Sequence, residues 1–172
     1  LEAGTRLTNH SKFGNQWTYS ANPYLYQELG SSFIKFGYSF ATAFISPTLY
    51  QSFGSLPYVL PNPDLKPETS LSQEINISFG KKDRSQIMSV SMFHRKEQNV
   101  FGYYTDPFTY LGIYKNISEN TTRGFEVEFN YQLTSKIGFG GNFSFVEKEN
   151  YSAMKRQPKQ RVNSYVEILP FK

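Results

Sequence analysis

The sequence contains no cysteine, so a disulfide framework and a thiolate metal site are both excluded. Histidine is nearly as scarce, because His10 and His94 are the only two in 172 residues. Nucleotide-binding, zinc-protease, serine-hydrolase and calcium-loop motifs are also missing. From these absences we predict no catalytic residue, no metal site, no cofactor and no enzymatic activity.

Long hydrophobic runs are absent as well, and the lack of any stretch of 18 apolar residues excludes a transmembrane helix. The formal net charge is only +4, and most lysines and arginines are scattered along the chain. A nucleic-acid partner is therefore not expected. Residues 1–4 contain neither a start methionine nor a signal-peptide pattern, so we expect the chain to begin inside a longer protein or after a removed leader.

Aromatic residues, in contrast, are abundant, and they alternate with small or polar residues. They make up 17% of the chain. Ile34, Phe36, Tyr38 and Phe40 share one parity, while lysine, glycine and serine stand between them. The same split recurs further along the chain, at 74–79, 88–92, 125–132 and 139–145. A period of two is typical of β-strands that have one apolar face.

This alternation predicts eight strands and no helix. The expected strands lie near residues 2–9, 16–27, 32–45, 70–80, 85–100, 111–132, 136–147 and 160–170, the sixth being interrupted at 118–121. Most are longer than the ~5–6 residues usual in soluble sheets. They have instead the length of about 9–11 residues with which a tilted strand crosses a membrane.

The predicted connections alternate between short and long. The short ones lie at 28–31, 81–84 and 133–135, and the long ones at 46–69, 101–110 and 147–159. An up-and-down membrane barrel sorts its connections in this way. The alternative is a soluble antiparallel sandwich. A sandwich would bury Phe36 and Phe129 in a core, whereas a membrane barrel would turn them toward lipid.

Four segments resemble the TonB-dependent receptors of Gram-negative outer membranes. Residues 43–51 are similar to the family's box at the exit of a barrel strand, although Ile45 stands where the family has arginine. Residues 114–116 with 123–128, and residues 158–163, resemble stretches of later strands. The most specific match is the proline-rich box at 62–70, carried by Asn62, Pro63, Leu65, Pro67 and Glu68.

The prolines of this box also allow a physical prediction that is independent of the resemblance. Proline has a fixed backbone angle and no amide hydrogen, and it restrains the residue before it to extended conformations. Asn62 and Asp64 favour turns because their side chains bond to nearby backbone. We therefore expect a stiff segment outside the sheet that leads into a strand beginning near Ser70.

The resemblance implies an all-β fold, namely an antiparallel up-and-down transmembrane β-barrel of roughly 22 strands with a plugged lumen. About eight strands over residues 1–172 would form a partial β-barrel domain, with the plug domain and the final strands absent. The implied location is the cell outer membrane. The implied partners are membrane lipid, lipopolysaccharide, the receptor's own plug domain and TonB.

The function implied by the resemblance is energised uptake of a scarce nutrient, either cobalamin or the small-molecule metal chelate of a ferric siderophore. No chemistry on the ligand is implied. The alternative is a passive outer-membrane porin or adhesin-like β-barrel without a plug. An outer-membrane hydrolase would need a serine–histidine pair, for which only two histidines are present.

Ligand contacts are predicted on the side of the long loops, where aromatic residues and a basic loop could meet a bulky anionic ligand. The candidates are Tyr50, Phe53, Tyr58, Tyr103, Tyr104 and Arg156. Three carboxylates with polar parity, Glu74, Glu126 and Glu128, are predicted to face the lumen. Paired carboxylates also serve glycoside hydrolysis, but a polar barrel interior is the preferred interpretation.

Overall fold

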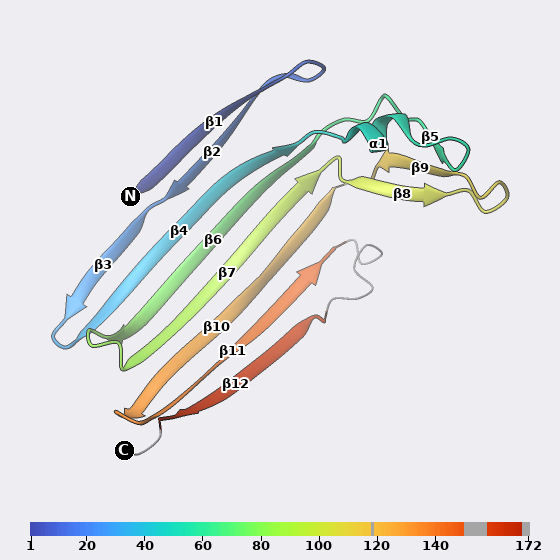
Figure 1. The fold of residues 1–172 in the computed structure, drawn as a ribbon. Coiled ribbons are helices and arrows are strands. Elements are labelled where there is room, and N and C mark those ends of the chain that lie inside the picture. Colours follow the sequence, from blue (N-terminus) through green and yellow to red (C-terminus); the bar gives the residue numbers. More distant parts are fainter. Residues whose placement is uncertain (118, 150–157, 170–172) are drawn as a thin grey trace.

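A computed structural model of the protein describes residues 1–117, 119–149 and 158–169 and consists mainly of one antiparallel sheet (Figure 1). The strands of this sheet pair in chain order, except that β3 (Tyr24–Leu29) does not pair with β2 and joins the sheet through β4. The order is β1 (Glu2–His10), β2 (Gly14–Asn22), β4 (Ser32–Ile45), β6 (Glu68–Lys81), β7 (Gln86–Gln98), β10 (Asn120–Thr134), β11 (Ile137–Lys148) and β12 (Gln160–Ile168).

The predicted strand at 16–27 is in fact two strands, β2 and β3, separated at Pro23. Proline has no amide hydrogen to donate to the ladder, so it is disfavoured in the interior of a strand. The pairing with β4 changes at the same point. Only Ser20 and Ala21 of β2 pair with β4, and β3 then pairs with β4 from Tyr24 to Leu29.

The long connections contain structure that the alternation did not predict. A helix, α1 (Leu49–Phe53), and a short strand, β5 (Val59–Leu60), lie between β4 and β6. Between β7 and β10, β8 (Phe101–Thr105) forms a hairpin with β9 (Gly112–Asn116), and β5 adds to β9 in parallel. The predicted strand at 111–132 is divided near the interruption predicted at 118–121, and its two parts are separate strands, because β9 belongs to this second sheet and β10 to the first.

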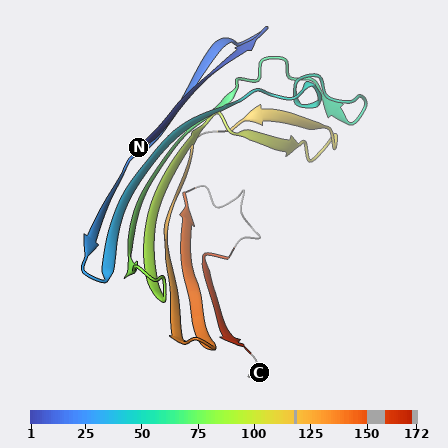
Figure 2. The ribbon, with the colours of Figure 1, turned by 60° about the vertical axis from the view of Figure 1, so that its left-hand side comes forward.

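The short and long connections lie at opposite ends of the strands, with one exception (Figure 1). Residues 30–31, 82–85 and 135–136 form the short turns at one end. The β1–β2 connection at 11–13 lies at the end of the long loops although it is short. Figure 2 shows the long strands as one curved layer, with α1, β8 and β9 extending from their upper ends to one side.

The strand register keeps the alternating pattern aligned across the sheet. Cα partners on adjacent strands place their side chains on the same face. One row of partners, from β4 to β12, is apolar throughout: Phe36, Ile77, Val90, Val127, Phe143 and Val162. The neighbouring row is almost entirely polar: Gly37, Asn76, Ser91, Glu126, Ser144 and Arg161. We call the surfaces that contain these rows the apolar face and the polar face.

The apolar face is not covered by a second layer in the described part of the chain. Phe36 and Phe129 keep 43% and 40% of their surface exposed. Val59 and Leu65 are the only buried hydrophobic residues among those described, and both belong to the long-loop region rather than to the main sheet. This arrangement contradicts the sandwich alternative. The one described helix, α1, is too short to cross a membrane.

Neighbouring residues of β7 lie on different faces, so we predict that they differ in how far a charged side chain destabilises the protein. With the apolar face against lipid, as the sequence predicts, Val90→Arg would place a cation in hydrocarbon and cost ~2–4 kcal/mol. Ser91→Arg would point to the polar face and cost much less. Denaturant unfolding of the full-length protein from lipid vesicles measures the difference. Equal destabilisation by the two substitutions would contradict the assignment of the faces.

Candidate functional site

Local interactions at both ends hold helix α1, which carries Tyr50, in place. Thr48 caps its N-terminus: the Thr48 hydroxyl accepts from the Gln51 amide at 3.2 Å, and the Gln51 side chain accepts from the Thr48 amide at 2.8 Å. Gly54 ends the helix with a φ of 66°. A side chain there would also collide, since a Cβ atom would lie 2.3 Å from the Val59 carbonyl oxygen. Glycine is thus required by both conformation and space.

Residues 62–68 of the proline-rich box lie between α1 and the β8–β9 hairpin and bond to both. We call these residues the clamp segment. The Asn62 amide donates to the Ser52 carbonyl, and the Asn62 side chain donates to the Tyr114 carbonyl, each at 2.8 Å. Leu65 has only 2% of its surface exposed. The clamp segment therefore contains half of the small apolar core of the loop region.

Asn116 makes the reciprocal connection from the hairpin. Its side-chain oxygen accepts from the Lys66 amide at 2.8 Å, and its side-chain nitrogen donates to the carbonyls of Lys66 and Asn99 at 2.9 and 2.7 Å. The Glu68 carboxylate accepts from the Phe101 amide at the start of β8. Side chains thus satisfy backbone groups that neither sheet can pair.

The stiff entry predicted from the prolines is present. Pro63 offers its carbonyl to the Lys12 ammonium in the β1–β2 turn, which ties a third loop to the clamp segment. The following strand begins at Glu68 rather than near Ser70, because Glu68 already pairs with Ile45 of β4. The residues of the box act here as a structural junction.

Two of the predicted ligand-contact tyrosines meet through a third that sequence reasoning gave no ligand role. Tyr114 on β9 packs against Tyr50, with ring centroids 6.1 Å apart and nearly perpendicular planes, and against Tyr103 at 5.0 Å. The Tyr103 side chain lies over Gly112, where a Cβ atom would stand 1.8 Å from the tyrosine hydroxyl. Tyr50 and Tyr103 each expose about half of their surface. The result is an aromatic cluster at the junction of α1 and the hairpin.

The remaining candidates do not join this cluster. Tyr104 follows Tyr103 on a strand, so it points to the opposite face of the hairpin, where the Lys115 ammonium lies 5.2 Å from its ring centroid. Phe53 and Tyr58 are exposed and make no ring contact with the cluster in the described part of the chain. Arg156 lies outside the described residues.

A turn at the tip of the hairpin is held by a carboxylate. Asp106 accepts hydrogen bonds from the backbone amides of Thr109 and Phe108 at 2.8 and 2.9 Å and from the Thr109 hydroxyl at 3.1 Å. These bonds, the Thr109 amide first, hold the pKa of the Asp106 carboxyl below its usual value.

Glu74, Glu126 and Glu128 all belong to the polar face. Glu126 lies between Ser91 and Ser144, and Glu128 takes the corresponding place one row away. Glu74 is opposite Ser39 and Phe93. Glu126 and Glu128 line a shallow polar hollow of 290 Å³ together with serine and asparagine side chains and Arg161. Because polar groups surround them, these carboxylates resemble hydrated side chains of a polar wall rather than a buried acid–base pair.

Residues 1–168 match the family model described as "TonB dependent receptor-like, beta-barrel". The chain belongs to this family. The main sheet is therefore an arc of a transmembrane β-barrel of the bacterial outer membrane, as the sequence predicted. Barrels of this kind have short periplasmic turns, long extracellular loops and an outward-facing apolar band.

Three relatives illustrate the similarity. The ferrienterobactin receptor of Escherichia coli strain K12 is 28% identical over 168 residues, covering 84% of this chain and 22% of that protein. The siderophore receptor PirA of Pseudomonas aeruginosa has a TM-score of 0.77 at 25% identity, with 95% and 30% of the two chains covered. A mutant of the ferric enterobactin receptor PfeA of the same organism, crystallised with enterobactin, has a TM-score of 0.73 at 19% identity, with 95% and 27% covered. The receptor segment thus spans less than a third of each relative.

Sequence reasoning missed the roles of Tyr114, Lys115 and Asn116, although all three stood in a segment with a family resemblance. Their contacts depend on the pairing of β8 with β9, and nothing local to either strand reveals that pairing. The alternation within the segment does carry one usable signal: Tyr114 and Asn116 share a parity, so they lie on one face.

Asn116→Ala is expected to loosen the clamp segment without unfolding the main sheet. It removes three hydrogen bonds to backbone groups, each worth about 0.5–1.5 kcal/mol. Hydrogen exchange of the Lys66 amide should therefore accelerate at least about tenfold, while amides of β6 and β7 keep their rates. Asn163→Ala, which removes a bond to Asn142 on the polar face, is the matched control and should leave Lys66 unaffected.

The turn at Asp106 is expected to open in acid. Because the folded-state pKa is lowered, the stabilisation is present above the ordinary carboxyl pKa of ~3.9 and is lost as the pH falls through the lower folded value. Exchange of the Phe108 and Thr109 amides, corrected for its intrinsic pH dependence, should rise over that window. Asp106→Asn should abolish the transition, and a transition that persists in this variant would refute the assignment.

Proposed function

We propose that this chain forms part of the wall and the extracellular loops of a TonB-dependent transporter that takes up a ferric siderophore. The observation that carries the proposal is the aromatic cluster on the extracellular side, in a segment whose relatives are named as siderophore receptors. No chemistry on the ligand is required. The plug domain and TonB, expected outside this segment, would supply passage and energy.

The loop region suits an anionic chelate that contains aromatic rings. Tyr50 and Tyr103 present half-exposed rings that are each already packed against Tyr114, so little side-chain freedom is lost on binding. On the other face of the hairpin, Lys115 and Tyr104 combine a cation with a ring. A cation over a ring and a tyrosine hydroxyl both favour a negatively charged aromatic ligand over a neutral one.

The polar face would line the lumen, with Glu74, Glu126 and Glu128 directed inward. Neighbouring side chains on this wall are hydrogen-bonded, as Asn76 is to Ser91 at 2.8 Å, so the wall is polar and suited to hydration rather than to apolar contacts. A plug domain that fills such a lumen would meet carboxylates and amides. We infer that these three carboxylates contact the plug or its surrounding water.

The two alternatives have less support. Cobalamin remained open on sequence grounds, but the three relatives described above are named as receptors for siderophores or for ferric enterobactin. A porin or adhesin-like barrel without a plug is also disfavoured, since the family model that matches residues 1–168 is that of receptors.

Growth rescue distinguishes the substrates. The full-length gene, expressed in a host that lacks its own siderophore and cobalamin receptors, should restore growth on ferric enterobactin under iron limitation. It should not restore growth when cobalamin is limiting. Rescue by cobalamin alone would overturn the siderophore assignment.

Substitutions in the hairpin test where the ligand binds. Lys115→Ala and Tyr104→Ala remove the two partners of the cation–π pair and should each weaken ferric-siderophore binding about fivefold. Arg6→Ala on β1 removes the same charge from an exposed site outside the loops and serves as the control. Deletion of residues 101–116 that left binding unchanged would remove the ligand role of the hairpin.

A further inference from the structure

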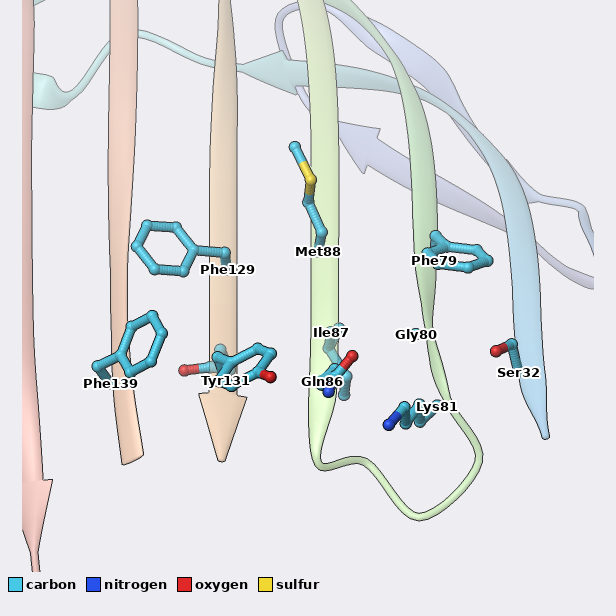
Figure 3. A pocket seen from close by; sticks show the side chains of 11 residues that line it. Ser32, Phe79, Gly80, Lys81, Gln86, Ile87, Met88, Phe129, Tyr131 and Phe139 are labelled. Atoms are coloured by element: carbon cyan, nitrogen blue, oxygen red, sulfur yellow. The ribbon is translucent and has the colours of Figure 1, made fainter. Parts of the chain in front are cut away.

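An apolar groove of 440 Å³ lies on the sheet near the short-turn end, away from the long-loop region. Its walls are the side chains of Phe79, Met88, Phe129 and Phe139, which come from four adjacent strands. Figure 3 shows Phe79, Met88 and Phe129 at one level and Phe139 nearer the strand ends. All four belong to the apolar face, so the groove opens toward lipid.

Polar groups close the groove at the level of the strand ends. Lys81, Gln86 and Tyr131 share the parity of the apolar face, and all three line the groove (Figure 3). An ammonium, an amide and a phenol at the end of an apolar channel match the boundary between hydrocarbon and headgroups. Because this end carries the short turns, the boundary is that of the periplasmic leaflet.

The charges around this rim favour an anion. Lys82 is already paired with Glu28, and the Asp83 carboxylate accepts from the Ser85 amide and hydroxyl at 2.9 and 2.7 Å. Lys81 makes no ion pair within the described residues, although its charge acts on the nearby Asp83 carboxylate. Among the residues that line the groove, Lys81 is the one cation.

We propose that the groove binds one anionic glycerophospholipid of the periplasmic leaflet. An acyl chain would lie between Phe79, Met88 and Phe129, and the phosphate would be held by the Lys81 ammonium with Gln86 and Tyr131 beside it. A headgroup with a net negative charge is preferred to a zwitterionic headgroup. The amine of a zwitterionic headgroup would lie near Lys81 and Lys82 rather than near a free carboxylate. This inference depends on the membrane location of the barrel and is independent of the transported ligand.

Native mass spectrometry of the full-length receptor in mild detergent tests the proposal. The receptor is titrated with phosphatidylglycerol and with phosphatidylethanolamine of the same acyl chains. Tighter binding of phosphatidylglycerol is expected. Lys81→Ala should weaken phosphatidylglycerol binding about fivefold and nearly remove the preference. Lys35→Ala removes the same charge from the polar face and should change neither lipid.

A second variant tests the acyl chain independently of the charge. Met88→Trp fills the groove with a larger apolar side chain that remains compatible with lipid, and it should weaken both phospholipids equally. Retention of the barrel's circular dichroism shows that the variants are folded. Equal binding of the two lipids by the wild-type receptor, or equal binding by the Lys81→Ala and Lys35→Ala variants, would overturn the proposal. Unchanged binding by Met88→Trp would also overturn it.

Discussion

The whole arrangement depends on the backbone ladder that joins neighbouring strands from β4 to β11, with a register shift between Gln132 and Thr134 at the short-turn end. From β4 to β11 the pairing satisfies the main-chain donors and acceptors and keeps side chains of one parity on one surface. A slip by one residue would move Phe36 or Val127 into the polar face. In lipid the ladder is also obligatory, because unpaired main-chain groups have no water to bind. One constraint thus determines both the fold and the chemistry of its two surfaces.

The loop region is held together by other interactions, because its chain leaves the sheet and its backbone groups need partners outside the main ladder. A small core of Val59 and Leu65 and the bonds of Asn62 and Asn116 replace the missing ladder. The tyrosines owe their positions to this junction rather than to the barrel. The proline-rich box thus contributes to the assembly of the loop region.

The alternating pattern was sufficient to predict most of the main sheet and the side on which Phe36 and Phe129 lie. It failed where other signals compete. Pro23 divides a predicted strand, and the combination of Thr48, Gln51 and Gly54 forms one helical turn that a search for longer apolar stripes overlooks. The β8–β9 pairing could not be predicted from the alternating pattern, because the pairing of strands within a loop depends on residues that are distant in the sequence. Tyr103 and Tyr104 were accordingly predicted together, although they lie on opposite faces of the hairpin.

The division at Pro23 leaves the wall unevenly joined. Every residue of β4 is paired with β6, whereas on its other edge β2 contributes only Ser20 and Ala21. Near the extracellular end, the Thr42 hydroxyl bonded to the Tyr19 backbone replaces the ladder. Under lateral tension the sheet would part along this seam first. The wall thus yields most easily between β2 and β4, at the end of the strands that lies beside the loops and far from the short turns.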